Sequence, residues 1–147
     1  MAVTALASAA PAGTVLAFDF GTQRIGVAVG ETSLGVAHPL TTLANRGQRH
    51  FAAIAALIAE WRPALLLVGL PTHADGTPHV MTARSRRFGG ELRRRFSLPV
   101  AFGDERFTTQ EASSRARSAS AKARKAMRDS LAAQVLLQAY LDEHHAA

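Results

Sequence analysis

Several residue types are rare or missing in this 147-residue sequence. It contains no cysteine, which excludes disulfide bonds, thiolate zinc sites and cysteine nucleophiles and suits a reducing cytoplasm. Its longest apolar run, residues 64–70, is far shorter than the about 20 residues that span a bilayer, so we expect no membrane-spanning segment. Residues 1–13 contain no lysine or arginine, and we expect them to form a flexible extension rather than an export signal.

Positive charge is concentrated in the C-terminal part of the chain. The sequence carries 17 Lys and Arg residues against 11 Asp and Glu residues, for a formal net charge of +6. Thirteen of the basic and seven of the acidic residues fall within residues 84–147, so this part holds the whole excess. A one-sided positive field attracts polyanions, which are usually nucleic acids and less often anionic membranes. A surface that only confers solubility is the alternative.

The spacing of apolar residues predicts a single α/β domain over residues 14–147. Three short apolar segments separated by turn residues, 14–20, 25–29 and 36–43, predict a three-stranded antiparallel meander. Residues 64–69 and 98–103 predict two further strands, each preceded by a segment with helical spacing. The predicted helices are 48–61, 79–96, one that opens near Thr108 and one from Met127. We therefore expect a central five-stranded mixed sheet, a meander plus parallel strands, flanked by helices.

Residues 113–125 stand out as a small, polar and basic segment. They comprise five Lys or Arg residues, four serines and four alanines, with no side chain able to anchor them in a core. We expect a mobile loop that becomes ordered on a polyanion, because ordering it brings no apolar burial in return. The alternative is that its alanines extend a helix.

Acidic residues stand at the predicted ends of strands. Asp19 lies between two phenylalanines at the end of the first strand, Asp104 and Glu105 follow the fifth strand, and Asp129 precedes the apolar stripe of the last helix. The carboxyl ends of parallel strands meet at one edge of a sheet, where ligands bind. Clustered carboxylates repel one another unless a cation lies between them, and oxygen ligands favour Mg²⁺ or Mn²⁺. The alternatives are that Asp129 is an ordinary acid at a helix N-terminus and that Asp104 pairs with Arg106.

The first predicted hairpin also fits a phosphate-binding turn. A strand, an aspartate, a Gly-Thr turn and a returning strand can direct backbone N–H groups at a phosphate, as in actin-like sugar kinases. Those proteins close two lobes over ATP, whereas this chain has enough residues for one. ATPase-like chemistry would therefore need a second copy of the chain.

Four segments together resemble a known family. They are DFGTQRIGVAVG (19–30), VGLPTHADG (68–76), DERFTT (104–109) and DSLAAQVLLQAYL (129–141). Their order and spacing resemble the YqgF/RuvX proteins, which are described as pre-16S rRNA nucleases and as Holliday junction resolvases. The resemblance implies an RNase H-like fold, divalent-metal dependence, a cytoplasmic location and a role in processing the 5′ end of precursor 16S rRNA. The second segment departs from the family pattern at His73 and Ala74, where Asn-Met is usual.

The same resemblance implies which acids are catalytic. The acidic positions of the family fall on Asp19, on the adjacent Asp104 and Glu105, and on Asp129. Alternation along an extended chain sends Asp104 and Glu105 to opposite faces, so we expect only one of them to bind metal. Glu105 has the longer side chain, and we expect it to be the metal ligand together with Asp19 and Asp129.

Basic and hydroxyl side chains near these acids are the expected substrate contacts, because an arginine can hold a phosphate with two parallel hydrogen bonds. The expected substrate-binding residues are Arg24, Arg86, Arg87, Arg94, Arg106, Thr108, Thr109, Arg124 and Lys125. Solvated helix faces are the alternative for the clustered arginines. Because aromatic residues make up only 6% of the chain, we expect recognition of phosphates and shape rather than of stacked single-stranded bases.

The sequence thus predicts a metal-dependent endonuclease that hydrolyses phosphodiester bonds in structured precursor rRNA, as a monomer or homodimer on a pre-ribosomal particle. Two metal ions about 4 Å apart can activate a water and stabilise the leaving oxygen in such a reaction. Branched DNA is the alternative substrate. The alternative from another class is a non-catalytic RNA-binding ribosome-assembly factor whose carboxylates serve only the structure.

Overall fold

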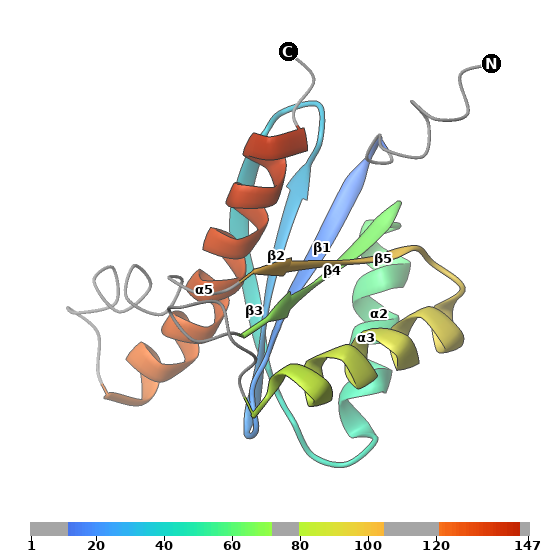
Figure 1. Ribbon diagram of the computed structural model, residues 1–147. Coiled ribbons are helices and arrows are strands. Elements are labelled where there is room, and N and C mark those ends of the chain that lie inside the picture. The colour runs from blue at the N-terminus through green and yellow to red at the C-terminus, as the bar shows by residue number, and fades with distance from the viewer. Residues whose placement is uncertain (1–11, 72–79, 105–120, 145–147) are drawn as a thin grey trace.

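The computed structural model describes residues 12–71, 80–104 and 121–144, with only the helical backbone for residues 121–126. Within them, a five-stranded sheet lies between one helix on one face and two on the other (Figure 1). The strands are β1 (Thr14–Phe20), β2 (Arg24–Glu31), β3 (Val36–Ala44), β4 (Leu65–Leu70) and β5 (Val100–Asp104). The helices are α2 (Arg49–Trp61), α3 (Thr82–Phe96) and α5 (Ala121–His144). None of these helices combines the length and hydropathy needed to cross a membrane.

The strand order in the sheet is β3-β2-β1-β4-β5. β1, β2 and β3 pair antiparallel, whereas β4 runs parallel to β1 and β5 runs parallel to β4. The predicted mixed α/β sheet, a meander followed by parallel strands, is confirmed. The carboxyl ends of β1, β4 and β5 consequently lie at one edge of the sheet, which is where the acidic residues were expected.

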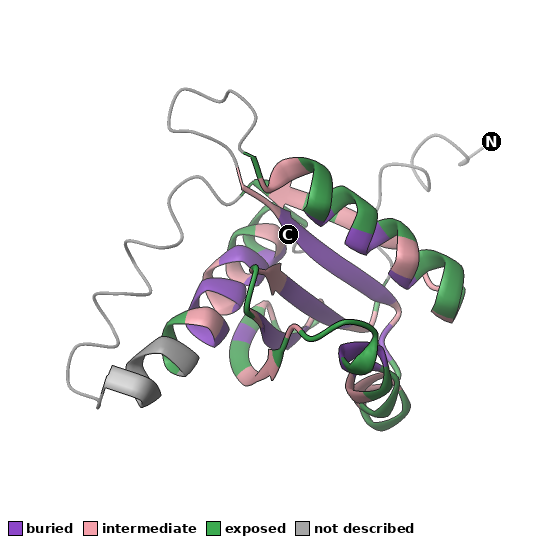
Figure 2. Ribbon diagram, turned by 90° about the horizontal axis from the view of Figure 1, so that it is seen from below, coloured by how far each residue is buried: buried purple, intermediate pink, exposed green. Residues whose placement is uncertain are grey.

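Alternation along β1 separates two cores. Leu16 and Phe18 face α2 and α3, whereas Val15 and Ala17 face α5. The first core is completed by Phe51, Ile54, Phe88 and Leu92, and the second by Leu136, Leu137 and Leu141. Figure 2 shows the central strands buried between helices that expose their outer faces. The face on which an acidic residue at the edge of the sheet lies therefore decides whether it is close to α5 or to α2 and α3.

Beyond Arg24, the side of β2 that faces α5 carries only the small residues Gly26, Ala28 and Gly30. A Cβ atom on Gly30 would lie 3.0 Å from a methyl group of Leu141 and 3.2 Å from one of Leu137. Contacts this short leave no room for a side chain. The absence of large side chains along this strip allows α5 to lie close to β2.

The last helix begins earlier than predicted. Residues 121–125, expected to belong to a mobile loop, form the start of α5. Alanine, lysine and arginine are among the best helix formers, so the helix continues here without an apolar face. The loop prediction was wrong for these residues, while residues 113–120 lie outside the described residues. Asp129 consequently lies in the third turn of α5, and the interpretation of Asp129 as an N-terminal helix acid was wrong as well.

The described chain starts close to the predicted domain boundary. Residues 1–11 of the expected extension lie outside the described residues. Gly13 is already joined to the sheet, because its N–H donates to the Thr32 hydroxyl and its carbonyl accepts from the Thr32 N–H. Gly13 is therefore attached to the sheet through β-sheet-like hydrogen bonds to Thr32.

Candidate active site

Asp19 and Asp129 lie on the same face of the sheet. Asp19 pairs with Gly26 across β1 and β2, so the side-chain directions at these two positions point to the same face. A Cβ atom on Gly26 would lie 1.9 Å from the carbonyl oxygen of Asp129, so this position lies against the backbone of α5. Alternation along β1 agrees, because Val15 and Ala17 also face α5. Two aspartates from distant parts of the sequence thus lie on the same face of the sheet, where β1 ends and α5 crosses β2.

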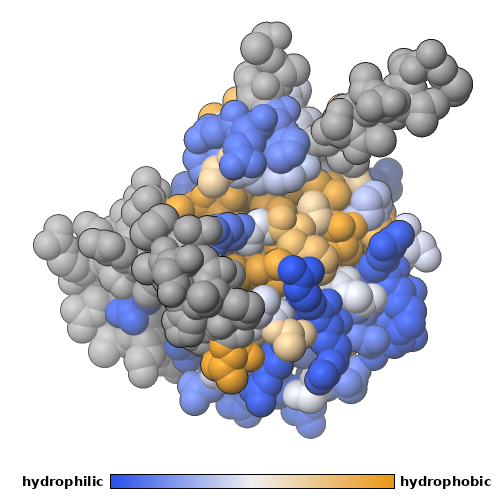
Figure 3. Space-filling view, viewed as in Figure 1, coloured by the Kyte–Doolittle hydropathy of each residue, from blue (hydrophilic) through white to orange (hydrophobic). Residues whose placement is uncertain are grey.

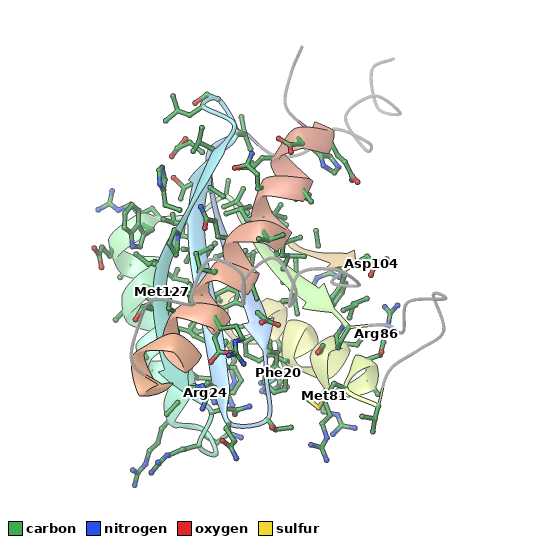
Figure 4. The ribbon with its side chains drawn as sticks, turned by 90° about the vertical axis from the view of Figure 1, so that its left-hand side faces the viewer. Phe20, Arg24, Met81, Arg86, Asp104 and Met127 are labelled. Carbon is green, nitrogen blue, oxygen red and sulfur yellow. The ribbon has the colours of Figure 1, made fainter. Side chains whose placement is uncertain are left out.

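Arg24 forms an ion pair with Asp129 at this position. Its Nε donates a hydrogen bond to Oδ2 of Asp129 at 2.5 Å. The two side chains are 35% and 23% exposed, so the pair lies at the rim of the protein and not in its core. Figure 4 shows Arg24 below the N-terminal half of α5. The site therefore contains a guanidinium beside its carboxylates.

The turn that follows Asp19 is held by backbone contacts. The N–H of Gly21 donates to the carbonyl of Arg24, and a Cβ atom at position 21 would lie only 2.7 Å from that oxygen. The side-chain amide of Asn45 donates to the carbonyl of Gly21 at 2.7 Å. A depression of about 460 Å³ beside this turn is lined by Arg24 and Arg46. Two guanidiniums at one depression are suited to binding a phosphodiester backbone.

Asp104 points to the other face of the sheet. Val100 packs with the core on the α2 and α3 side, whereas Ala101 packs with α5, so alternation places Asp104 on the side of Val100. β4 also separates β5 from β1, which amounts to two strand spacings of about 4.8 Å each. In Figure 4, Asp104 lies far from Arg24. The structure does not bring Asp104 together with the two aspartates described above.

The donor set at this edge fits a hard divalent cation. Among the residues that the structure describes, no three His, Cys, Asp or Glu side chains form a complete metal site. Asp19 and Asp129 supply two carboxylates, and Mg²⁺ is commonly bound by one or two carboxylates together with waters and substrate phosphates. Oxygen donors also suit Mn²⁺. The expected ligand Glu105 and its neighbours Arg106, Thr108 and Thr109 lie outside the described residues, and their roles stay predictions.

The arginines of α3 are not equivalent. Arg94 donates two hydrogen bonds to Glu91, at 2.6 and 3.1 Å, and these bonds hold the pKa of the Glu91 carboxyl below its usual value. Arg86 lies over the ring of Phe102, 5.6 Å from its centroid, and Arg87 lines a cavity. Hydrophilic side chains over α3 border hydrophobic surface in Figure 3. Arg94 thus shows the local ion pairing of a solvated helix face.

Two of the expected substrate contacts cannot be placed, and one residue of the site was not predicted. The side chains of Arg124 and Lys125 are not among those that the structure describes. Gly26 was missed in the sequence, although it touches the backbone of Asp129. The available signal was the segment IGVAVG, in which Gly or Ala occupies every second position of a strand. That spacing indicates a strand face without side chains, against which another backbone can pack.

Comparison with known proteins assigns the chain to a family. The family model described as "RuvX: Holliday junction resolvase" matches residues 13–143. A protein of Dechloromonas aromatica named "Putative pre-16S rRNA nuclease" is 55% identical over 136 residues, which cover 90% of this chain and 93% of that protein. A protein of Nitrosospira multiformis with the same name is 51% identical over 143 residues, 95% of each chain. RuvC of T. thermophilus, solved with a Holliday junction substrate, is 12% identical over 82% of this chain and 91% of that chain, with a TM-score of 0.48. The chain therefore belongs to the RuvX family.

Proposed function

We propose that this protein is a metal-dependent nuclease that hydrolyses phosphodiester bonds in the precursor of 16S rRNA. The observation that carries the proposal is the placement of Asp19 and Asp129 on one face of the sheet, beside Arg24. Identities of 51% and 55% to proteins named as pre-16S rRNA nucleases support the choice of substrate. The excess of basic residues in the C-terminal half supports a polyanionic substrate.

Asp19 and Asp129 would hold Mg²⁺ or Mn²⁺, joined by Glu105. When bound, such an ion polarises the phosphodiester and lowers the pKa of a bound water. Arg24, whose Nε donates to Asp129, presents its guanidinium to the phosphate backbone. Arg106, Thr108 and Thr109 follow β5 in the sequence and would hold the phosphate from the other side of the site.

The positively charged surface would position the substrate strand. Arg86 and Arg87 are exposed on α3, and their guanidiniums can contact phosphates without first leaving a carboxylate partner among the described residues. The protein would act in the cytoplasm on structured RNA within a pre-ribosomal particle. It would work as a monomer or homodimer.

Cleavage of branched DNA is the second candidate function. The description of the matching family as a Holliday junction resolvase favours it. Symmetric cleavage of a four-way junction needs two active sites, so this function would require a homodimer. A four-way junction is therefore the competing substrate in the experiment below.

The test compares wild-type protein with Asp19→Asn, which removes a negative charge but little volume. We expect wild-type protein to cleave a 5′-extended 16S rRNA fragment in Mg²⁺ or Mn²⁺, and the variant to be at least about 10³-fold slower. Glu60→Gln, which removes an exposed carboxylate from α2, should cleave at the wild-type rate. Cleavage by Asp19→Asn at the wild-type rate would contradict the proposed site. Binding without cleavage by wild-type protein in either metal would favour the ribosome-assembly factor, and preference for the junction would favour the resolvase.

A further inference from the structure

A cavity of about 300 Å³ opens on the face of the sheet opposite to Asp19. It lies between β1, the beginning of α2 and one side of α3, where Phe20, His50 and Arg87 are among its lining residues. Its volume is at the lower end of the range of small-molecule sites, about 300–1,000 Å³. Neither the two aspartates nor Arg24 lines it, so it is distinct from the candidate active site.

Aromatic rings form the wall of this cavity. Phe20 and Phe88 are stacked with their centroids 4.5 Å apart and their planes at 29°, and Phe51 lies nearly parallel to Phe88 at 26°. Phe51 and Phe88 are buried, whereas Phe20 is half-buried. Phe20, the least buried of the three, is therefore the ring that a nucleobase can reach, and a flat aromatic surface accepts any base because every base has a π face. Three of the few aromatic residues in the chain are therefore gathered at one cavity.

A buried histidine at the cavity has an unused hydrogen-bonding atom. His50 is only 6% exposed, and its Nδ1 has no hydrogen-bond partner among the described residues. Burial, and to a lesser extent the positive charge of Arg95, lowers the pKa of His50, which favours the neutral ring. A neutral imidazole has one donor and one acceptor nitrogen, as the edge of a base requires. Buried polar atoms are nearly always hydrogen-bonded, and because Nδ1 is shielded from solvent, a base reaches it only if the ring turns toward the cavity.

Two arginines line the same cavity. Arg84 and Arg87 are exposed on α3, one helical turn apart, and neither is ion-paired with another described residue. The neighbouring Arg95 differs, because it donates to Gln48 at 2.5 Å and to Glu91 at 3.2 Å. Guanidiniums next to an aromatic wall match a base together with its phosphate.

We propose that this cavity binds an unpaired nucleobase of the substrate strand, with His50 at the edge of the base and Arg84 and Arg87 at the adjacent phosphates. The inference rests on the proposed function in one respect: the bound strand is taken to be the substrate of the nuclease. Phe20 follows Asp19 in β1, and alternation sends these two side chains to opposite faces of the sheet. A strand that crosses the carboxyl end of β1 can therefore place one phosphate at Asp19 and a nearby base in the cavity. The sequence predicted recognition without stacked bases, because aromatic residues make up only 6% of the chain.

The test uses the full chain in EDTA, where metal-dependent cleavage cannot occur, and a single-stranded RNA with one 2-aminopurine. Stacking of this fluorescent base quenches its emission, while anisotropy reports binding of the whole strand. We expect wild-type protein to quench the emission and Arg84→Gln to bind the strand about tenfold more weakly. Arg93→Gln is the matched control, because it removes the same charge from an exposed position of α3 that does not line the cavity. It should bind like wild-type protein.

Phe20→Leu removes one ring from the wall and keeps it apolar. We expect this variant to lose most of the quenching and about tenfold in affinity, with a thermal melting curve that shows it is folded. Equal affinity of Arg84→Gln and Arg93→Gln, or full quenching by folded Phe20→Leu, would overturn the proposal. Competition with a free nucleotide tests the source of the base. Displacement of the strand by millimolar AMP supports a base site. If the protein quenches the emission of a free 2-aminopurine nucleotide but not that of the labelled strand, the proposal that the strand occupies the cavity is overturned. Because cleavage is measured separately in Mg²⁺, a failed base site and a failed nuclease proposal give different results.

Discussion

Gly26 lies directly against the backbone of Asp129. A Cβ atom at position 26 would come 1.9 Å from the Asp129 carbonyl oxygen and 2.9 Å from the backbone nitrogen of Ser130. Both are contacts to backbone, so no side-chain rotation can relieve them. Since Asp19 is the cross-strand partner of Gly26, this glycine sets how closely the helix that carries Asp129 approaches the strand that carries Asp19.

Gly26→Ala should therefore displace α5 and impair both stability and cleavage. Overpacking of a well-packed core typically costs about 1–3 kcal/mol, and a clash with backbone belongs at the upper end of this range. Urea unfolding measures the stability, and cleavage of the rRNA fragment measures the activity. Gly90→Ala is the matched control: a Cβ atom on Gly90 meets nothing within 4 Å, and alanine in a helix interior should stabilise the protein by about 0.4–1 kcal/mol. Equal stability of the two variants would contradict the role given to Gly26.

The strands and the sheet could be predicted from the sequence because their signals are local. The observed β1 has the predicted bounds, and the observed β4 differs by one residue at each end, because runs of apolar residues bounded by Gly and Pro define both. The beginning of α5 could not be predicted in this way. Its first residues have no apolar face, and only the helix propensity of alanine, lysine and arginine signalled a helix there.

The candidate site was harder to predict because its geometry depends on long-range packing. Sequence reasoning placed Asp19, Asp104 and Asp129 at one edge, but only the pairing of the strands shows that Asp104 faces away from the other two. The ion pair of Arg24 with Asp129 likewise joins residues far apart in the chain. Nothing local in the sequence encodes such pairs.

Arg24→Gln should slightly destabilise the metal-free protein and strengthen its binding of Mn²⁺. Loss of a partly exposed ion pair typically costs about 0.2–1 kcal/mol, which urea unfolding can detect. The guanidinium beside Asp129 repels a second cation, so its removal should lower the dissociation constant for Mn²⁺ in titration calorimetry. Arg62→Gln, at an exposed position that follows α2, should leave Mn²⁺ binding unchanged. Weaker Mn²⁺ binding by Arg24→Gln would show that Arg24 helps to form the metal site and does not compete with the ion.

The free energy of unfolding should decrease as the pH is lowered, because His50 titrates. Folding lowers the pKa of His50 below 6.5, through burial first and then through Arg95. Between that lowered pKa and 6.5 the unfolded chain binds a proton that the folded protein does not, so the free energy of unfolding decreases as the pH falls through this window. Below the folded-state pKa the decrease stops. Three charged residues of α3, Arg84, Arg87 and Glu91, line the cavity with His50, and Arg95 acts on it directly. Glu91 stays ionised in this range, because hydrogen bonds from Arg94 and Arg95 hold its pKa below the usual value.

His50→Gln should remove this contribution. Urea unfolding between pH 7.5 and pH 5 should show a smaller loss of stability for this variant than for wild-type protein. His38→Gln, a replacement at an exposed position of β3, serves as the control and should follow the wild-type curve. Identical pH profiles of His50→Gln and wild-type protein would show that burial of His50 has no influence on the titration.

Replacing Arg86, Arg87 and Arg94 with alanine should weaken nucleic-acid binding and flatten its dependence on salt. Each lost phosphate contact should reduce the slope of log K against log salt by up to about 0.9 on duplex DNA and about 0.7 on single strands. Fluorescence anisotropy over a series of KCl concentrations measures this slope. A variant that lacks the exposed Arg49, Arg62 and Arg93 has the same net charge and should keep the wild-type slope.

The single substitutions should not contribute equally. Arg94 donates two hydrogen bonds to Glu91, so a phosphate must compete with a carboxylate that is already bound. Arg87 is not ion-paired with any described residue, and it lines the cavity beside Phe20 and Phe88. Arg87→Ala should therefore change the slope by nearly one phosphate contact, and Arg94→Ala by much less. An unchanged slope for the triple variant would identify these arginines as a solvated helix face, and equal changes for the two single variants would show that the Glu91 pair opens readily when the strand binds.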